Sequence, residues 1–143
     1  MAEQRVSLIT LGTADLARSR RFYVEGFGWS PVFEAEDIVF YQLNGIILAT
    51  YRNDSFADDM GVAAVPAPGG FAIAHNVRCE DEVAPLMARL AEAGGRIVRT
   101  ADSPPHGGLR GYVADPDGNP WEIAYNEGIP IDAEGNLTFP EGA

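Results

Sequence analysis

The sequence contains little cysteine and no long apolar run. Its single cysteine, Cys79, excludes an internal disulfide framework and is typical of a protein of the reducing cytoplasm. No apolar stretch approaches the roughly 20 residues that a membrane-spanning helix requires. The polar start MAEQR does not resemble a signal peptide. The sequence therefore predicts a cytoplasmic protein with no membrane partner.

Cationic residues are also few. Ten Lys and Arg residues stand against 21 Asp and Glu residues, which gives a formal net charge of −11. Binding to a phosphate backbone requires clustered cations, so nucleic acid is not expected as a partner. The acidic balance would favour a cationic ligand if the carboxylates line a cleft, and otherwise it describes a solvated surface. With 46% hydrophobic residues in 143, the chain is expected to form one domain with its own core.

The first half of the chain predicts one helix among four strands. Asp15 is placed to cap a helix that stops at Gly28. Asn44-Gly45 is a strong hairpin signal between two β-rich runs. The predicted strands of this half are residues 6–11, 31–34, 38–43 and 46–51.

The second half repeats the same order. A helix is predicted to begin near Asp81 and to stop at Gly94-Gly95. The turn DPDG stands where Asn44-Gly45 stood in the first half. The predicted strands are residues 71–77, 96–100, 109–114 and 120–125. The chain thus divides into a βαβββ module at about 5–51, a linker at 52–70, a second βαβββ module at about 71–126, and a C-terminal tail at 127–143.

Three motifs carry a resemblance that spans about residues 5–126. They are TADLARSRRFY (13–23), EAGGRIV (92–98) and GYVADPDGNPWEIAY (111–125). In this order and spacing the chain resembles the vicinal oxygen chelate superfamily, which includes glyoxalase I, bleomycin-resistance proteins and extradiol dioxygenases. The resemblance implies an α+β fold in which two tandem βαβββ modules form a cup-shaped mixed sheet. It also implies completion of the cup in a homodimer.

The resemblance further implies where a metal would bind. Metal-using members place one ligand, typically His or Glu, on each of strands one, four, five and eight. Glu122 matches the last position, whereas the other three fall at Leu8, at Leu48 (or Ala49 if the hairpin register differs by one) and at Ala72. Aliphatic side chains have no lone pair to donate, and one carboxylate does not make a catalytic site. We therefore expect no metal and no other cofactor.

Without a metal, the role of Glu122 is interpreted in three ways. It is a polar group for a cationic or hydrogen-bonding ligand, an acid–base catalyst in an apolar pocket, or a structural carboxylate held by backbone amides or Arg110. Tyr112 stands where extradiol dioxygenases place a catalytic tyrosine, although it also suits core packing. The loop with His106 resembles a loop at the edge of the cup in related proteins. Strand alternation places His75 on the sheet face opposite to that of Ala72 and Ala74. The candidate ligand-binding residues are Leu8, Thr10, Leu48, Thr50, Ala72, Ala74, His106, Tyr112 and Glu122, with Glu122 and Tyr112 as the catalytic candidates.

Two functions remain open on these residues. The first is a metal-free protein that binds a small cationic or aromatic molecule in the cup. The second is an enzyme of the same fold, either a metal-dependent lyase, isomerase or dioxygenase, or an acid–base catalyst that uses Glu122. Three inward-facing His or Glu side chains would favour the metal enzyme, and only Glu122 is found. The identity of the ligand, and whether the cup lies within one chain or across two, are left open by the sequence.

Overall fold

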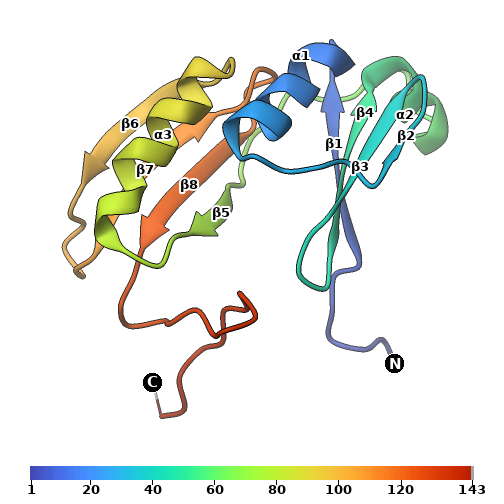
Figure 1. The fold of residues 1–143 in the computed structure, drawn as a ribbon. Coiled ribbons are helices and arrows are strands. Elements are labelled where there is room, and N and C mark those ends of the chain that lie inside the picture. The colour runs from blue at the N-terminus through green and yellow to red at the C-terminus, as the bar shows by residue number, and fades with distance from the viewer. Residues whose placement is uncertain (143) are drawn as a thin grey trace.

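The computed structural model describes residues 1–142 and shows two modules of the same α+β design (Figure 1). In the first module the elements are β1 (Leu8–Thr13), α1 (Leu16–Arg21) with the π-helical turn η1 (Phe22–Gly26), β2 (Phe33–Glu34), β3 (Ile38–Gln42) and β4 (Ile47–Arg52). In the second module they are β5 (Ile73–Asn76), the 3-10 turn η2 (Glu80–Glu82) with α3 (Val83–Glu92), β6 (Arg96–Asp102), β7 (Leu109–Ala114) and β8 (Pro120–Tyr125). The predicted tandem βαβββ order is confirmed.

The two sheets have the same topology. The N-terminal sheet runs β1-β4-β3-β2 and the C-terminal sheet runs β5-β8-β7-β6. In each sheet the first strand pairs in parallel with the last strand of its module, and all other pairs are antiparallel. The repeat seen in the sequence is therefore a repeat of backbone architecture.

The predicted helix cap and the predicted hairpin turn both form in the structure. The Asp15 carboxylate accepts the Arg18 backbone N–H at 3.1 Å and caps α1. The predicted hairpin turn closes with a bond from the Leu43 N–H to the Ile46 carbonyl, and Gly45 has a φ of 72°. A positive φ of this size strains most residues but not glycine.

The segment predicted as a linker holds a helix, α2 (Asn53–Met60). Its polar composition gives no sign of packing against a neighbouring element. The ring of Phe56 nevertheless stacks on that of Tyr51, with centroids 5.6 Å apart. Gly61 ends the helix in the left-handed conformation, with a φ of 72°. The helix within the linker was not predicted, and the chain is irregular only after Gly61.

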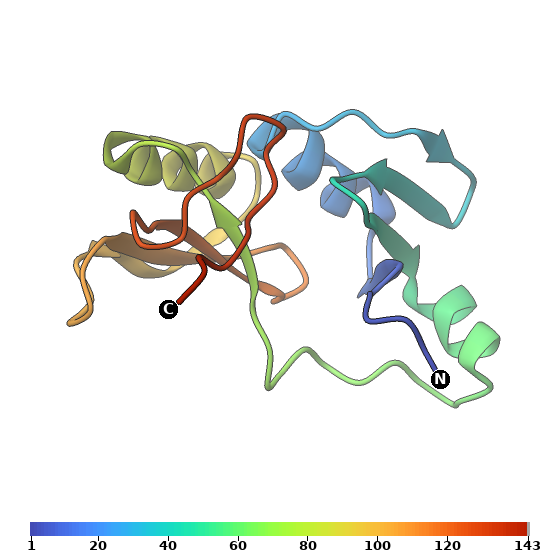
Figure 2. The same ribbon diagram turned by 90° about the horizontal axis from the view of Figure 1, so that it is seen from below.

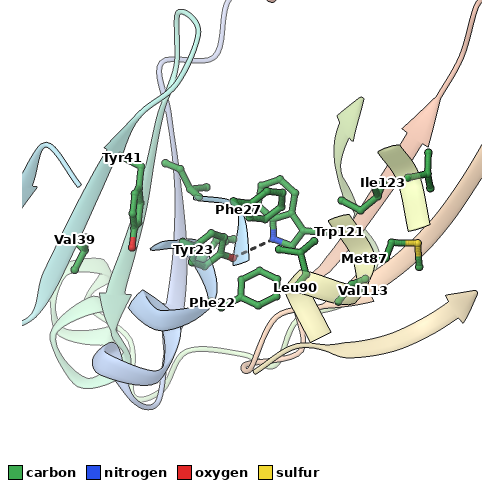
Figure 3. Packing of buried hydrophobic residues seen from close by; sticks show 13 residues of the cluster. Phe22, Tyr23, Phe27, Val39, Tyr41, Met87, Leu90, Val113, Trp121 and Ile123 are labelled. Carbon is green, nitrogen blue, oxygen red and sulfur yellow. Dashed lines mark hydrogen bonds between the residues drawn. The ribbon is translucent and has the colours of Figure 1, made fainter. Parts of the chain in front are cut away.

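One core lies between the two sheets. Tyr23 from η1 contacts Tyr41 of the N-terminal sheet and Trp121 of the C-terminal sheet, with ring centroids 5.7 and 5.9 Å apart. Trp29 likewise contacts rings of both sheets. Figure 3 shows η1 between Tyr41 on one side and Trp121 on the other. Since single aromatic rings reach both sheets, the helix-covered inner faces of the sheets face each other, and their outer faces point away from this shared core.

The C-terminal segment joins the ends of the two modules. It contains a turn at 132–136 closed by an isolated bridge between Ile131 and Leu137. In Figure 2 it runs close to the end of β5. Within residues 1–142 there is no helix of the length and apolar character needed to cross a membrane.

Candidate functional site on the outer sheet faces

Glu122 lies at the centre of the outer face of the C-terminal sheet. In the register it stands opposite Ala74 on β5 and Tyr112 on β7. Its neighbour Trp121 points to the inner face and is 2% exposed. Glu122 itself is half-buried, and in the described part of the chain it forms no ion pair with an arginine. The small methyl of Ala74 leaves its carboxylate accessible from the outer side.

Arg110 does not neutralise Glu122, contrary to one of the three interpretations. The Arg110 guanidinium pairs with the Asp102 carboxylate and donates to the Asp102 carbonyl at 3.3 Å. Arg99 donates to the same carboxylate at 2.9 Å. Two arginines and one aspartate therefore form a network of their own beside Glu122 on the same outer face.

Tyr112 and Glu122 form a polar pair. Partial burial raises the pKa of the Tyr112 phenol, and the adjacent Glu122 carboxylate raises that pKa further by its charge and by hydrogen bonding. Arg110 and Arg99 act in the opposite direction more weakly. Tyr112 is thus a neutral donor beside a carboxylate acceptor, and the pair can orient a polar group of a ligand or move a proton.

The outer face of the N-terminal sheet carries only part of the predicted set. Leu8 and Thr10 pair with Ile47 and Ala49 and share this face. Leu48 and Thr50 pair instead with Ile9 and Leu11, are each 1% exposed, and lie on the inner face. The outward position expected for Leu48 and Thr50 was wrong, and the stated alternative, Ala49, is the residue of β4 that faces outward beside Thr10.

The outer faces of one chain do not converge. Leu8 and Thr10 lie on one side of the shared core, and Ala74, Tyr112 and Glu122 lie on the other side. Ala72 precedes β5 and is exposed. His106 is exposed in the β6–β7 loop. The predicted cup of Leu8, Leu48, Ala72 and Ala74 around Glu122 is therefore not assembled within a single chain.

Three of the four positions at which the family places metal ligands provide no donor atom. Leu8, Ala49 (the alternative to Leu48) and Ala72 stand at these positions, and none of their side chains has a lone pair. Among residues 1–142 no group of three or more His, Cys, Asp or Glu side chains is placed to hold a metal ion. The donor set of one chain does not fit a catalytic divalent cation.

The DPDG turn that precedes Glu122 has a structural role that the sequence reasoning missed. One Asp115 oxygen accepts the backbone N–H groups of Asp117 and Asn119, and the other accepts the Tyr23 hydroxyl at 2.7 Å. Burial raises the pKa of Asp115 and these hydrogen bonds oppose the rise. The Trp121 indole in turn donates to Tyr23 at 3.1 Å. The signal was present in the sequence, because an aspartate that begins such a turn commonly accepts the following backbone N–H groups.

The same turn also contacts the start of the first helix. The Asp117 carboxylate accepts the Ala14 backbone N–H at 2.9 Å and the Arg18 guanidinium at 3.2 Å. Two of the three motifs that carry the resemblance, TADLARSRRFY and GYVADPDGNPWEIAY, are thus bonded to each other across the two modules. We call this contact, made by Ala14, Arg18, Tyr23, Asp115 and Asp117, the module seam.

Comparison with known proteins agrees with this architecture. The family model described as Glyoxalase/Bleomycin resistance protein/Dioxygenase superfamily matches residues 5–123. The chain belongs to this superfamily. The resemblance inferred from the three motifs is confirmed.

Solved structures of the superfamily resemble the chain to different degrees. A glyoxalase-related enzyme from Fulvimarina pelagi is 60% identical, with a TM-score of 0.93 over 96% of this chain and 99% of that one. The fosfomycin resistance protein FosX from Listeria monocytogenes is 19% identical, with a TM-score of 0.68 over 87% of this chain and 95% of that one, and shares the fold. No functionally curated protein matches the chain.

Proposed function

We propose that the chain binds a small molecule between two copies of itself. In this homodimer the outer face of the N-terminal sheet of one copy covers the outer face of the C-terminal sheet of the other. The single observation that carries the proposal is the Glu122 carboxylate, which is half-buried, faces outward at the sheet centre and is not neutralised by an arginine. A carboxylate in that position is stabilised by a ligand that donates a hydrogen bond or carries a cation.

The N-terminal sheet supplies the complementary apolar wall. Phe33 is 54% exposed and Leu8 is 39% exposed on its outer face. The rings of Phe33 and Phe40 lie next to each other there, with centroids 5.8 Å apart. Exposed apolar patches of this kind mark interaction surfaces. The ligand favoured by both faces has an aromatic or aliphatic body and one cationic or hydrogen-bond-donating group.

We also propose that this site works without the family metal. Leu8, Ala49 and Ala72 offer no ligand atoms, which leaves Glu122 as the one donor at the four family positions. Elemental analysis of untagged protein is expected to give well below one transition-metal ion per chain. An ion near one per chain that is lost in Glu122→Gln would contradict this.

A metal-free acid–base enzyme is the second candidate. It is favoured by the Tyr112–Glu122 pair, which places a phenol donor beside a carboxylate base, and by the description of the 60%-identical Fulvimarina pelagi protein as an enzyme. Tyr112→Phe separates the two candidates. A binding protein keeps most of its affinity in this variant, whereas an enzyme keeps its affinity and loses turnover.

The test of the binding site begins with a ligand screen. Cationic glycopeptides and aromatic metabolites are screened by thermal shift, and a ligand that is found is titrated against the wild type and Glu122→Gln. This variant keeps the shape and removes the charge, so a cationic ligand should bind about tenfold or more weakly.

Glu127→Gln removes the same charge from an exposed turn and is the matched control. Its affinity is expected to equal that of the wild type. Equal affinity of Glu122→Gln for a ligand shown to lie between the outer faces would return Glu122 to a structural role.

A further inference from the structure

A cavity of about 480 Å³ lies between the inner faces of the two sheets. Its lining also includes Ile47 and Ala74 from the outer faces, but neither Glu122 nor Tyr112. Small-molecule sites in proteins span roughly 300–1,000 Å³, so this volume suits a metabolite-sized compound. The residues of its wall that matter here are Ile9, Trp29, Leu48, Ile73, His75 and Trp121.

The C-terminal segment covers one side of this cavity. Glu134 and Gly135 from the turn at 132–136 are part of its lining. The Asn44 amide in the β3–β4 turn donates to the Glu134 carbonyl at 2.8 Å. Arg78, just after β5, donates to the Asp132 carbonyl at 2.9 Å. The turn is thus fixed to both modules and spans the space between them.

The wall combines aromatic rings with polar side chains, among them His75. Trp29 is half-buried and supplies aromatic surface, whereas Trp121 is 2% exposed and its indole N–H is already bonded to Tyr23. His75 is half-buried, and within residues 1–142 its imidazole makes no hydrogen bond to another side chain or to the backbone. Burial lowers the pKa of His75 and the nearby Glu82 opposes this more weakly, so the ring is neutral at neutral pH. A neutral imidazole offers one donor and one acceptor.

We propose that this inter-module cavity is a second ligand site, which takes a neutral aromatic compound with one hydroxyl or amide group. The aromatic ring packs against Trp29, and its polar group bonds to His75. The C-terminal turn closes over the bound compound. This site does not depend on the function proposed for the outer faces or on the formation of the dimer.

Intrinsic fluorescence tests the proposal directly, because the protein has two tryptophans and both line the cavity. The probe is 4-nitrobenzyl alcohol, whose nitroaryl ring quenches indole emission, and 4-nitrotoluene is the same ring without a hydroxyl. We expect saturable quenching by the alcohol with a dissociation constant on the order of 1 mM or below. Linear quenching of the same size as that of free N-acetyltryptophanamide would overturn the proposal.

Substitutions then locate the bound probe. His75→Leu should weaken the alcohol roughly fivefold, the effect of one hydrogen bond, and leave 4-nitrotoluene unchanged. Asn44→Ala releases the turn from the first module and should weaken both probes. Glu122→Gln should change neither, and an equal loss in this variant would place the probe on the outer face and overturn the second site.

A measurement on the wild type does not depend on whether these variants fold. The two indole N–H signals in a ¹⁵N-labelled sample report Trp29 and Trp121 separately. Both should shift with the same saturation curve as the fluorescence. Indole signals that stay unchanged at saturating probe would overturn the proposal.

Discussion

The two modules share one backbone plan but differ in what they present to the outside. On the N-terminal sheet the outer face is apolar, with Leu8, Phe33 and Phe40. On the C-terminal sheet the same face carries Arg99, Asp102, Arg110, Tyr112 and Glu122. The inner faces, in contrast, are both apolar and contribute to one core. The shared core restricts the inner faces to the same chemistry, whereas the outer faces are free to differ.

The largest effect on stability is expected at the module seam, where the two modules are bonded to each other. Asp115→Ala removes the acceptor of the buried Tyr23 hydroxyl and of the Asn119 amide, which donates at 2.8 Å. Leaving buried donors unpaired costs about 1–3 kcal/mol each, so the free energy of unfolding should fall by about 3 kcal/mol. Urea denaturation measures this change.

The second carboxylate of the seam is the control for this prediction. Asp117 accepts from Ala14 and Arg18 at positions that are partly open to solvent. Asp117→Ala should cost about 1 kcal/mol. If the two variants lose equal stability, the buried Tyr23–Asp115 bond is not what holds the modules together.

A smaller effect, on association, is expected when the apolar outer face of the N-terminal sheet is given a charge like those on the C-terminal sheet. Phe33→Glu places a charge on the apolar face and should weaken the proposed dimer at least tenfold, which corresponds to about 1.4 kcal/mol. Sedimentation velocity over a concentration series measures the association. Because Phe33 is exposed in the single chain, the stability of the monomer should hardly change.

The control makes the same substitution away from the sheets. Phe139 is 69% exposed in the C-terminal segment. Phe139→Glu should leave the association constant unchanged. A monomeric wild type at micromolar concentration would remove the dimer from the proposal altogether.

The smallest effect concerns the inner face of the C-terminal sheet. The pKa of His75 is lowered by burial, so the folded chain binds fewer protons than the unfolded chain once the pH falls below about 6.5. Stability should therefore decrease as the pH falls through this range, by less than about 1 kcal/mol between pH 7 and 5.5. His75→Gln should reduce the slope of unfolding free energy against pH.

The exposed His106 provides the matched variant for this comparison. His106→Gln removes the other histidine of the chain and should keep the wild-type slope. Thermal denaturation at a series of pH values gives both slopes. Equal slopes in all three proteins would show that His75 does not contribute to the acid sensitivity of the fold.

The strand order and the position of Glu122 were predictable from the sequence. The Asn44-Gly45 and DPDG turns set where strands end, and alternation from the second turn placed Glu122 opposite to Trp121 in orientation, as the structure shows. Asp15 marked the helix start for the same kind of local reason. Each of these features depends on a few neighbouring residues and on backbone chemistry alone.

Other features had no local signal. Leu48, Ala49 and Thr50 are all buried, so β4 has no apolar–polar alternation from which its inner face can be read. The helix α2 is polar in composition, and the contact between Phe56 and Tyr51 that supports it involves a tertiary neighbour. Both errors arise where burial is decided by packing against another element.

The sequence by itself determined the two βαβββ modules and their turns, because these follow from local propensity and periodicity. The resemblance to the family then implied that Glu122 is the single carboxylate at the four family positions. Only the tertiary structure decided that the inner faces of both sheets share one core. Aromatic rings of η1 and Trp29 reach both sheets and thereby turn the outer faces apart. This orientation depends on contacts between residues that are distant in the chain, which no local pattern records.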